Sequence, residues 1–338
     1  MGEFDLIERY FKTPARAMQG ATTGVTLGIG DDCALLQPAA GMQLAISSDM
    51  LVEGRHFLST VDPYKLGHKV LAVNLSDLAA CGAKPLAFTL ALALPRADEA
   101  WLAPFSRGLL ALAAEHNCAL VGGDTTQGPL NICITVFGEV PKATALLRSG
   151  AKAGDDIYVS GTVGDARLAL EVFRGNMELS GDAFTAARAR METPTPRVQL
   201  GIALRGIASS AIDVSDGLLG DLSHILLQSG VGALIDTSVA INLMDMDMNL
   251  IATEATNTPA GSQFLPQKQL EYVLAGGDDY ELVFTTPPAQ RSAVQAAAAA
   301  SSTPVTRIGQ IQAEPGLRLI DGQGQAVSNH FGSFDHFK

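Results

Sequence analysis

The sequence predicts an α/β (α+β) fold built as two mixed domains, and three observations lead to that prediction. Short apolar runs that suit strands alternate with longer segments of helical periodicity through most of the 338 residues. The 47% content of hydrophobic residues allows a core in each of two domains of ordinary size. Clusters of small residues with aspartate recur where the predicted strands end, which is where α/β sheets commonly bind ligands.

The N-terminal half is predicted to hold one sheet with flanking helices. Helical spacing from Phe4 to Phe11 is followed by a polar loop at residues 13–24. Asp62 and Pro63 are typical of a helix start, and Gly82 is typical of a helix end. Strands are expected at residues 25–29, 33–36, 43–46, 86–94, 119–121 and 132–136, and a second helix at residues 98–115.

The stretch from Arg148 to Asp155 combines small and charged residues without periodicity, which favours a domain boundary. The sequence therefore predicts one domain at residues 1–148 and another at residues 149–338. We expect an irregular insertion at residues 243–264. Elsewhere in the second domain, strands are expected at 157–159, 212–214, 283–285 and 305–308, and helices at 165–173, 195–207, 217–228 and 290–300.

Composition narrows the class of protein. Lys and Arg number 23 against 35 Asp and Glu, a formal net charge of −12, which argues against nonspecific binding to nucleic acid or to an anionic membrane. No apolar run approaches the roughly 18 residues of a membrane span, and the chain does not start like a signal peptide. The four cysteines lie in apolar segments without a C-x-x-C pair, so we expect buried free thiols and a cytoplasmic protein.

The pentapeptide Gly28-Ile29-Gly30-Asp31-Asp32 places two glycines just before two carboxylates. A simple turn would explain it alone, since glycine beside aspartate is ordinary turn chemistry. Helix capping would likewise explain any single aspartate, but independent caps need not follow successive strands. Further clusters of small residues with aspartate stand at residues 47–49, 74–77, 122–124, 213–217 and 276–279.

The chemistry open to these clusters is limited. The sequence has no Walker A motif, no third glycine of a dinucleotide fingerprint because Cys33 takes its place, and no zinc motif. Carboxylates that converge repel one another, so they require a hard cation such as Mg²⁺, which substrate phosphates usually complete. The combination predicts a nucleoside triphosphate. The candidate oxygen ligands are Asp32, Asp49, Asp77, Asp124, Asp213 and Asp216, with the hydroxyls of Ser47, Ser48 and Ser215.

Two basic residues could assist such a site. Arg148 could clamp phosphate oxygens, and His56 could donate to a phosphate or act as a base. The alternatives are that Arg148 is an ordinary surface arginine and that His56 is a solvated loop histidine. A calcium-binding module is a non-enzymatic alternative, but an EF-hand loop counted from Asp213 would have His224 where its last ligand, glutamate, is required.

With these motifs in order, the chain resembles the thiamine-monophosphate kinases of the aminoimidazole-ribonucleotide-synthetase-like ATP-binding superfamily. The resemblance implies direct transfer of the γ-phosphate of ATP to thiamine monophosphate, giving thiamine diphosphate, with several Mg²⁺ ions between the phosphates. It also implies a homodimer formed through the N-terminal domains. The matching stretches span nearly the whole chain: residues 3–4, 28–32, 73–80, 122–126, 148–151, 212–217 and 277–282.

The resemblance also implies roles for single residues. No dedicated catalytic base is expected, because an acceptor phosphate with a second pKa near 6 is already largely ionised at neutral pH. The family commonly has glutamate where this chain has Asp278, and often tryptophan where it has Phe331. The alternative role of Phe331 is packing of the C-terminal tail. The resemblance assigns Asp32, Ser47, Ser48, Asp49, Asp77, Asp124, Asp213 and Asp216 to metals, Gly123, Asp124, Arg148 and Ser215 to ATP, and His56, Asp278 and Phe331 to the thiamine substrate.

Two other functions stay open. Another ATP-dependent enzyme of the same superfamily would share every metal and ATP motif, and only His56, Asp278 and Phe331 argue against it. A metal-stabilised thiamine-phosphate-binding protein would bind without turnover. An assay with MgATP and thiamine monophosphate separates the three.

Overall fold

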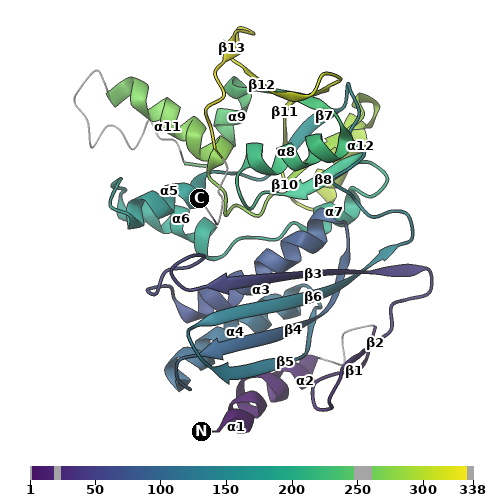
Figure 1. Cartoon of the computed structure of the whole chain (residues 1–338), viewed down its shortest axis with the longest axis vertical. Coiled ribbons are helices and arrows are strands. Elements are labelled where there is room, and N and C mark those ends of the chain that lie inside the picture. The colour runs from purple at the N-terminus through teal and green to yellow at the C-terminus, as the bar shows by residue number, and fades with distance from the viewer. Residues whose placement is uncertain (1, 19–23, 247–260, 333–338) are drawn as a thin grey trace. The chain divides into compact units, whose positions relative to one another are not determined.

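A computed structural model of the whole chain describes residues 2–18, 24–246 and 261–332. The chain divides into two compact units, Met1–Ala145 and Leu146–Lys338, whereas the expected boundary followed Arg148. Each unit combines helices with a sheet (Figure 1), which confirms the prediction of a mixed α/β fold in two parts.

The first unit is built on a four-stranded sheet in the order β3-β6-β4-β5. β4 and β5 run parallel, whereas β6 pairs antiparallel with β3 and with β4. The strands are β3 (Met42–Val52), β4 (Lys84–Leu94), β5 (Ala119–Gln127) and β6 (Asn131–Pro141).

β3 and β5 are longer than predicted, with consequences for two motifs. Residues 47–49 lie inside β3 and residues 122–126 lie inside β5, so the prediction that both follow a strand end is wrong. Serine, threonine and glycine did not end these strands, because pairing with a neighbouring strand continues through them. Successive side chains in the two motifs therefore point to opposite faces of the sheet.

Helices α3 (Pro63–Ala80) and α4 (Glu99–Glu115) cover one face of this sheet (Figure 1). α3 begins as predicted, since the Asp62 side chain accepts from the N–H of Tyr64 at 2.8 Å. The two helices approach closely at Gly67, where a Cβ would lie 2.1 Å from the Phe105 carbonyl oxygen.

The opposite face of the sheet is partly open. A small two-stranded sheet, β1 (Val25–Leu27) with β2 (Leu35–Leu36), packs against one end of it. On β3, Leu44, Ile46 and Met50 point away from α3 and are 43%, 60% and 54% exposed. Apolar surface of this kind is typical of a face that a partner covers.

The N-terminal segment is helical for longer than predicted. It comprises α1 (Glu3–Ile7), the π-helical turn η1 (Glu8–Lys12) and α2 (Thr13–Met18), so the loop predicted to start at Thr13 is wrong. Ala15 is buried, as Phe11 is, and burial of both apolar side chains explains why the helix continues.

The second unit holds a seven-stranded sheet in the order β13-β12-β9-β11-β7-β10-β8. Only β9 and β12 pair in parallel; the other pairs are antiparallel. Three of its strands were not predicted, because β9 and β12 start with glycine and β13 has two residues. The strands are β7 (Asp156–Ser160), β8 (Ser210–Asp213), β9 (Gly232–Asp236), β10 (Leu282–Thr286), β11 (Val305–Gln312), β12 (Gly316–Ile320) and β13 (Ala326–Val327).

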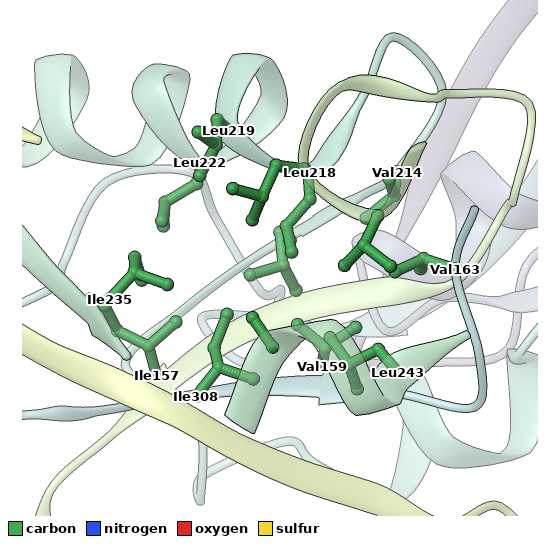
Figure 2. Packing of buried hydrophobic residues seen from close by; sticks show 14 of the residues in the cluster. Ile157, Val159, Val163, Val214, Leu218, Leu219, Leu222, Ile235, Leu243 and Ile308 are labelled. Atoms are coloured by element: carbon green, nitrogen blue, oxygen red, sulfur yellow. The ribbon is translucent and has the colours of Figure 1, made fainter. Parts of the chain in front are cut away.

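The core of this unit lies between its sheet and its helices. Figure 2 shows Leu218 and Leu222 of α8 in the same apolar cluster as Ile157 and Ile235 from the sheet. The predicted helix at residues 195–207 is shorter, and most of the predicted insertion at residues 243–264 lies outside the described residues. The helices are α5 (Asp165–Phe173), α6 (Gly181–Glu192), α7 (Val198–Ala203), α8 (Leu218–Ser229), α9 (Thr237–Ala240), α11 (Gly261–Ala275) and α12 (Arg291–Ala300), with 3-10 turns η3 (Ile241–Leu243) and η4 (Pro288–Gln290).

All four cysteines are free, as predicted, but they are not all buried. Cys118 is buried, Cys81 and Cys133 are half-buried, and Cys33 is exposed because it stands in the loop after Asp32. Within the part of the chain that the structure describes, no helix is both long and apolar enough to cross a membrane.

Candidate functional site

Polar residues of β3 and α3 meet in the first unit. Ser47 and Asp49 lie on the face of β3 that α3 covers, and the Ser47 hydroxyl donates to an oxygen of the Asp77 carboxylate. The backbone N–H of Asp49 donates to Oδ1 of Asn74 at 3.2 Å. Asn74 and Asp77 thus act from one face of α3, as their spacing predicted.

This cluster concentrates negative charge. The pKa of Asp49 is raised from 3.8 to about 7, first by burial and then by the charge and hydrogen bond of Asp77. A cation between the two carboxylates would relieve this repulsion, and carboxylate and hydroxyl oxygens are the ligands that Mg²⁺ prefers. The residues present therefore fit a divalent cation.

Ser48 lies apart from this cluster. Its hydroxyl oxygen is 2.9 Å from the hydroxyl oxygen of Thr135 on β6 and donates to the Ile134 carbonyl at 3.2 Å. Because side chains alternate along β3, the Ser48 hydroxyl lies on the open face of the sheet, opposite to Ser47 and Asp49.

A cavity of about 150 Å³ brings a second group of predicted residues together. Asp32 and Asp124 both line it, and so does Gly123. A side chain would not fit at Gly123, where φ is +142° and a Cβ would lie 1.9 Å from the Leu90 carbonyl oxygen. Two carboxylates and the glycine backbone of β5 thus line one cavity.

Sequence reasoning missed another wall of this cavity. Ile7 and Phe11 of the N-terminal helical segment line it and make that wall apolar. A Cβ on Gly30 would lie 3.2 Å from Nη2 of Arg16, so a guanidinium also stands beside the loop. The helical periodicity from Phe4 to Phe11 was the available signal, but it predicts only a short helix and not its place in a cavity wall.

His56 is oriented by a local hydrogen bond. The backbone N–H of Val52 donates to its Nδ1 at 3.0 Å. Nδ1 is therefore an acceptor, and the neutral ring carries its proton on Nε2. This tautomer suits donation to a phosphate better than proton abstraction.

In the second unit, Asp213 ends β8 and the turn after it carries Ser215 and Asp216. The backbone N–H groups of Ser215 and Asp216 both donate to Oδ2 of Asp221, each at 3.0 Å. Sequence reasoning missed Asp221, which resembles an ordinary acidic residue in the first turn of a helix.

The surroundings of Asp221 also locate Arg148. Burial is the largest cause that raises the pKa of Asp221 to about 7, and the Arg148 guanidinium opposes that rise. Arg148 itself is exposed. Its charge therefore acts on the turn that carries Ser215 and Asp216, as a phosphate-binding residue there would need to.

The predicted substrate residues of this unit have distinct settings. Asp278 has a φ of +65°, and its backbone N–H donates to the Ser215 carbonyl at 2.8 Å. Phe331 stacks on His330 with ring centroids 4.5 Å apart and also packs, partly buried, against the apolar core. The ring of Phe331 therefore packs against the core and stacks on His330 at the same time.

The carboxylates that the structure describes do not form one large metal centre. Among residues 2–18, 24–246 and 261–332, no group of three or more His, Cys, Asp or Glu side chains could hold a metal ion. Mg²⁺ is usually bound by one or two carboxylates together with waters and substrate phosphates. Carboxylate pairs are therefore the arrangement expected of a magnesium–nucleotide site.

Comparison with known proteins extends this description. Residues 30–140 match the AIR synthase related protein N-terminal domain, and residues 152–322 match the AIR synthase related protein C-terminal domain. The chain is 44% identical to thiamine-monophosphate kinase of Salmonella typhimurium over 99% of this chain and 98% of that protein.

Two solved structures are similar over nearly the whole chain. Thiamine-monophosphate kinase from Stenotrophomonas maltophilia is 42% identical with a TM-score of 0.83, over 95% of this chain and 98% of that one. AaThiL complexed with AMPPCP and TMP is 27% identical with a TM-score of 0.74, over 99% of this chain and 97% of that one.

Proposed function

The chain belongs to the thiamine-monophosphate kinase family of AIR synthase related proteins, and on this premise we propose its reaction. It is an ATP-dependent phosphotransferase that transfers the γ-phosphate of ATP to thiamine monophosphate, giving thiamine diphosphate and ADP. The observation that carries this conclusion is the 44% identity to a thiamine-monophosphate kinase over 99% of the chain. The likeness to AaThiL, solved with AMPPCP and TMP, supports the two substrates.

The proposed metal is Mg²⁺, in several ions. Its ligands in the first unit are the pair Asp49 and Asp77 with Ser47, and the pair Asp32 and Asp124. Burial and then the charge of Asp77 raise the pKa of Asp49 to about 7, which supports the first pair, and the shared cavity supports the second. Ser48 is not proposed as a ligand of the first pair, because its hydroxyl lies on the opposite face of β3 from Ser47 and Asp49. Asp213 and Asp216 are the proposed ligands of the second unit.

When bound, Mg²⁺ neutralises phosphate oxygens and aligns the two phosphates for in-line transfer. The chain itself needs no catalytic base, because the acceptor phosphate is already largely ionised at neutral pH. His56, with its proton on Nε2, is proposed to donate a hydrogen bond to the thiamine substrate. Asp278 and Phe331 are the other proposed contacts of that substrate.

ATP is proposed to contact Gly123 and Asp124 in the first unit and Arg148 and Ser215 in the second. Gly123 lets β5 lie close to β4, because a Cβ there would lie 1.9 Å from the Leu90 carbonyl oxygen, and its backbone lines the cavity. The apolar wall of the same cavity suits a flat ring. The guanidinium of Arg148, beside the turn of Ser215, suits phosphate oxygens.

A homodimer through the first unit is also part of the proposal. Three apolar side chains of β3, Leu44, Ile46 and Met50, are exposed on the open face of the sheet. A second copy of the chain that packs the same face against this one would bury all three.

The test is an assay of the purified protein with MgATP and thiamine monophosphate, following ADP and thiamine diphosphate separately. Stoichiometric formation of both products supports the proposed reaction. ADP formed only with other acceptors would identify another enzyme of the superfamily, and binding without conversion would identify a binding protein. Thiamine is the matched control, because its hydroxyl would need a base and should give no product.

A further inference from the structure

Two irregular segments of the second unit lie side by side: residues 213–217, the nucleotide turn, and residues 277–281, the acceptor segment. The N–H of Asp278 donates to the Ser215 carbonyl at 2.8 Å. Gly277 permits this approach, because a Cβ there would lie 2.6 Å from the same carbonyl oxygen. The two segments therefore extend the pairing of β8 with β10.

The acceptor segment has an unfavourable backbone conformation. Asp278 and Tyr280 have φ values of +65° and +54°, in the left-handed region that residues other than glycine rarely adopt. Such a conformation persists only where the surrounding structure fixes it. The contacts of the neighbouring residues show what fixes it here.

Asp279 anchors the acceptor segment to α5. The side chain is 2% exposed, and its Oδ1 accepts from the N–H of Gly164, the residue before α5, at 2.9 Å. Its Oδ2 is buried and has no hydrogen-bond partner among the described residues. Burial raises the pKa of Asp279 well above its ordinary value, so a neutral side chain of the same shape should serve as well.

Glu281 is a second anchor at the start of β10. It is fully buried and accepts from the Ser160 hydroxyl at 2.6 Å and from Nε of Arg197 at 2.6 Å. This anchor would remain if Asp279 were lost. A variant of Asp279 should therefore release the region of Asp278 without unfolding the sheet.

Asp221 anchors the nucleotide turn independently. Its side chain is 3% exposed and accepts from the backbone of both Ser215 and Asp216. It belongs to α8, and both of these hydrogen bonds go to the nucleotide turn. The two segments thus have separate side-chain supports.

We propose that Asp279 and Asp221 are positioning residues of the reaction, Asp279 for the segment that carries Asp278 and Asp221 for the turn that carries Ser215 and Asp216. This inference rests on the proposed function. If it is correct, loss of Asp279 impairs use of thiamine monophosphate, and loss of Asp221 impairs use of ATP.

The experiment measures kcat and both KM values for the full-length wild type and for Asp279→Ala, Asp221→Ala and their asparagine counterparts. Asp279→Ala should raise KM for thiamine monophosphate about ten-fold while KM for ATP stays within about two-fold. Asp221→Ala should raise KM for ATP about ten-fold while KM for thiamine monophosphate stays within about two-fold. Both asparagine variants should stay near wild type, since the amide oxygen still accepts the same N–H groups. If Asp279→Ala does not fold, Asp279→Ser is measured in its place, because the serine hydroxyl is too short to reach the N–H of Gly164.

Asp156→Ala is the matched control for lost stability. Asp156 is fully buried on β7 and accepts from Nε of Arg291 at 2.6 Å, but it pairs with Thr286 at the far end of β10. The Asp156→Ala variant should have a lower melting temperature and unchanged KM values for both substrates. The inference is overturned if Asp156→Ala raises a KM value as much as Asp279→Ala or Asp221→Ala does. It is also overturned if Asp279→Ala or Asp221→Ala raises both KM values equally, or raises neither. A wild type without turnover of thiamine monophosphate would instead refute the proposed function.

Discussion

Replacing Asp77 by asparagine should stabilise the metal-free protein while removing its response to Mg²⁺. The substitution keeps the shape of the side chain but removes the negative charge beside Asp49. Most single substitutions destabilise a protein, so a gain in stability would be a specific signature of relieved repulsion. It would also show that Asp77 is present for a ligand and not for the fold.

The magnitude follows from the pKa of Asp49. A rise of the Asp49 pKa from 3.8 to about 7 corresponds to about 4 kcal/mol between the charged and neutral forms. Burial is the larger cause and persists in Asp77→Asn, so the charge of Asp77 accounts for about 1–2 kcal/mol of this difference.

The sign of the pH dependence is also fixed. A carboxyl whose pKa is higher in the folded state contributes stability that is fully present below pH 3.8 and is lost as pH rises through about 7. The difference between Asp77→Asn and wild type should therefore be small at pH 5 and reach about 1–2 kcal/mol at pH 8.

Urea unfolding in EDTA at pH 5 and pH 8 measures this difference, and the same titrations with Mg²⁺ measure the metal response. At a Mg²⁺ concentration of a hundred times Kd, the wild type should gain about 2.7 kcal/mol and the variant much less. The reasoning is refuted if the variant is less stable than wild type at pH 8 in EDTA, or if Mg²⁺ stabilises both equally.

Three further outcomes are expected. Asp124→Asn should reduce kcat/KM at least about a hundred-fold, with an unchanged circular dichroism spectrum, because it removes a proposed metal ligand; an active variant contradicts that role. Ile46→Lys should convert a dimer to a monomer in sedimentation experiments, because it places a charge on the apolar face of β3, whereas Leu227→Lys, exposed on α8, should not; a dimeric Ile46→Lys protein would place the interface elsewhere. Iodoacetamide should label exposed Cys33 long before buried Cys118, and MgATP should slow labelling of Cys33 because it follows Asp32; equal rates with and without MgATP would argue against nucleotide at that cavity.

Features that depend on neighbouring residues could be predicted from the sequence. The start of α3 is an example, since Asp62 caps N–H groups two and three residues further along. The placement of Asn74 and Asp77 on one helix face is another, since it depends only on helical geometry. Asp213 likewise stands at a strand end, as expected.

Features that depend on distant partners could not be predicted. Whether residues 47–49 end β3 is decided by β6, which pairs with them from about ninety positions away, and this pairing puts Ser48 on the other face. The roles of Asp279 and Glu281 could not be predicted for the same reason, because their partners Gly164 and Ser160 are more than a hundred residues distant. No local pattern marks such contacts.

The acceptor segment of residues 277–281 has no regular secondary structure, yet it is tied to Ser215, to Gly164 and to the ion pairs of Glu281. A loop with so many fixed points loses its conformational entropy when the protein folds, not when the substrate arrives. Substrate binding then need not order the backbone around Asp278, which favours affinity without any added contact. Irregular backbone in this unit is therefore compatible with a preorganised site.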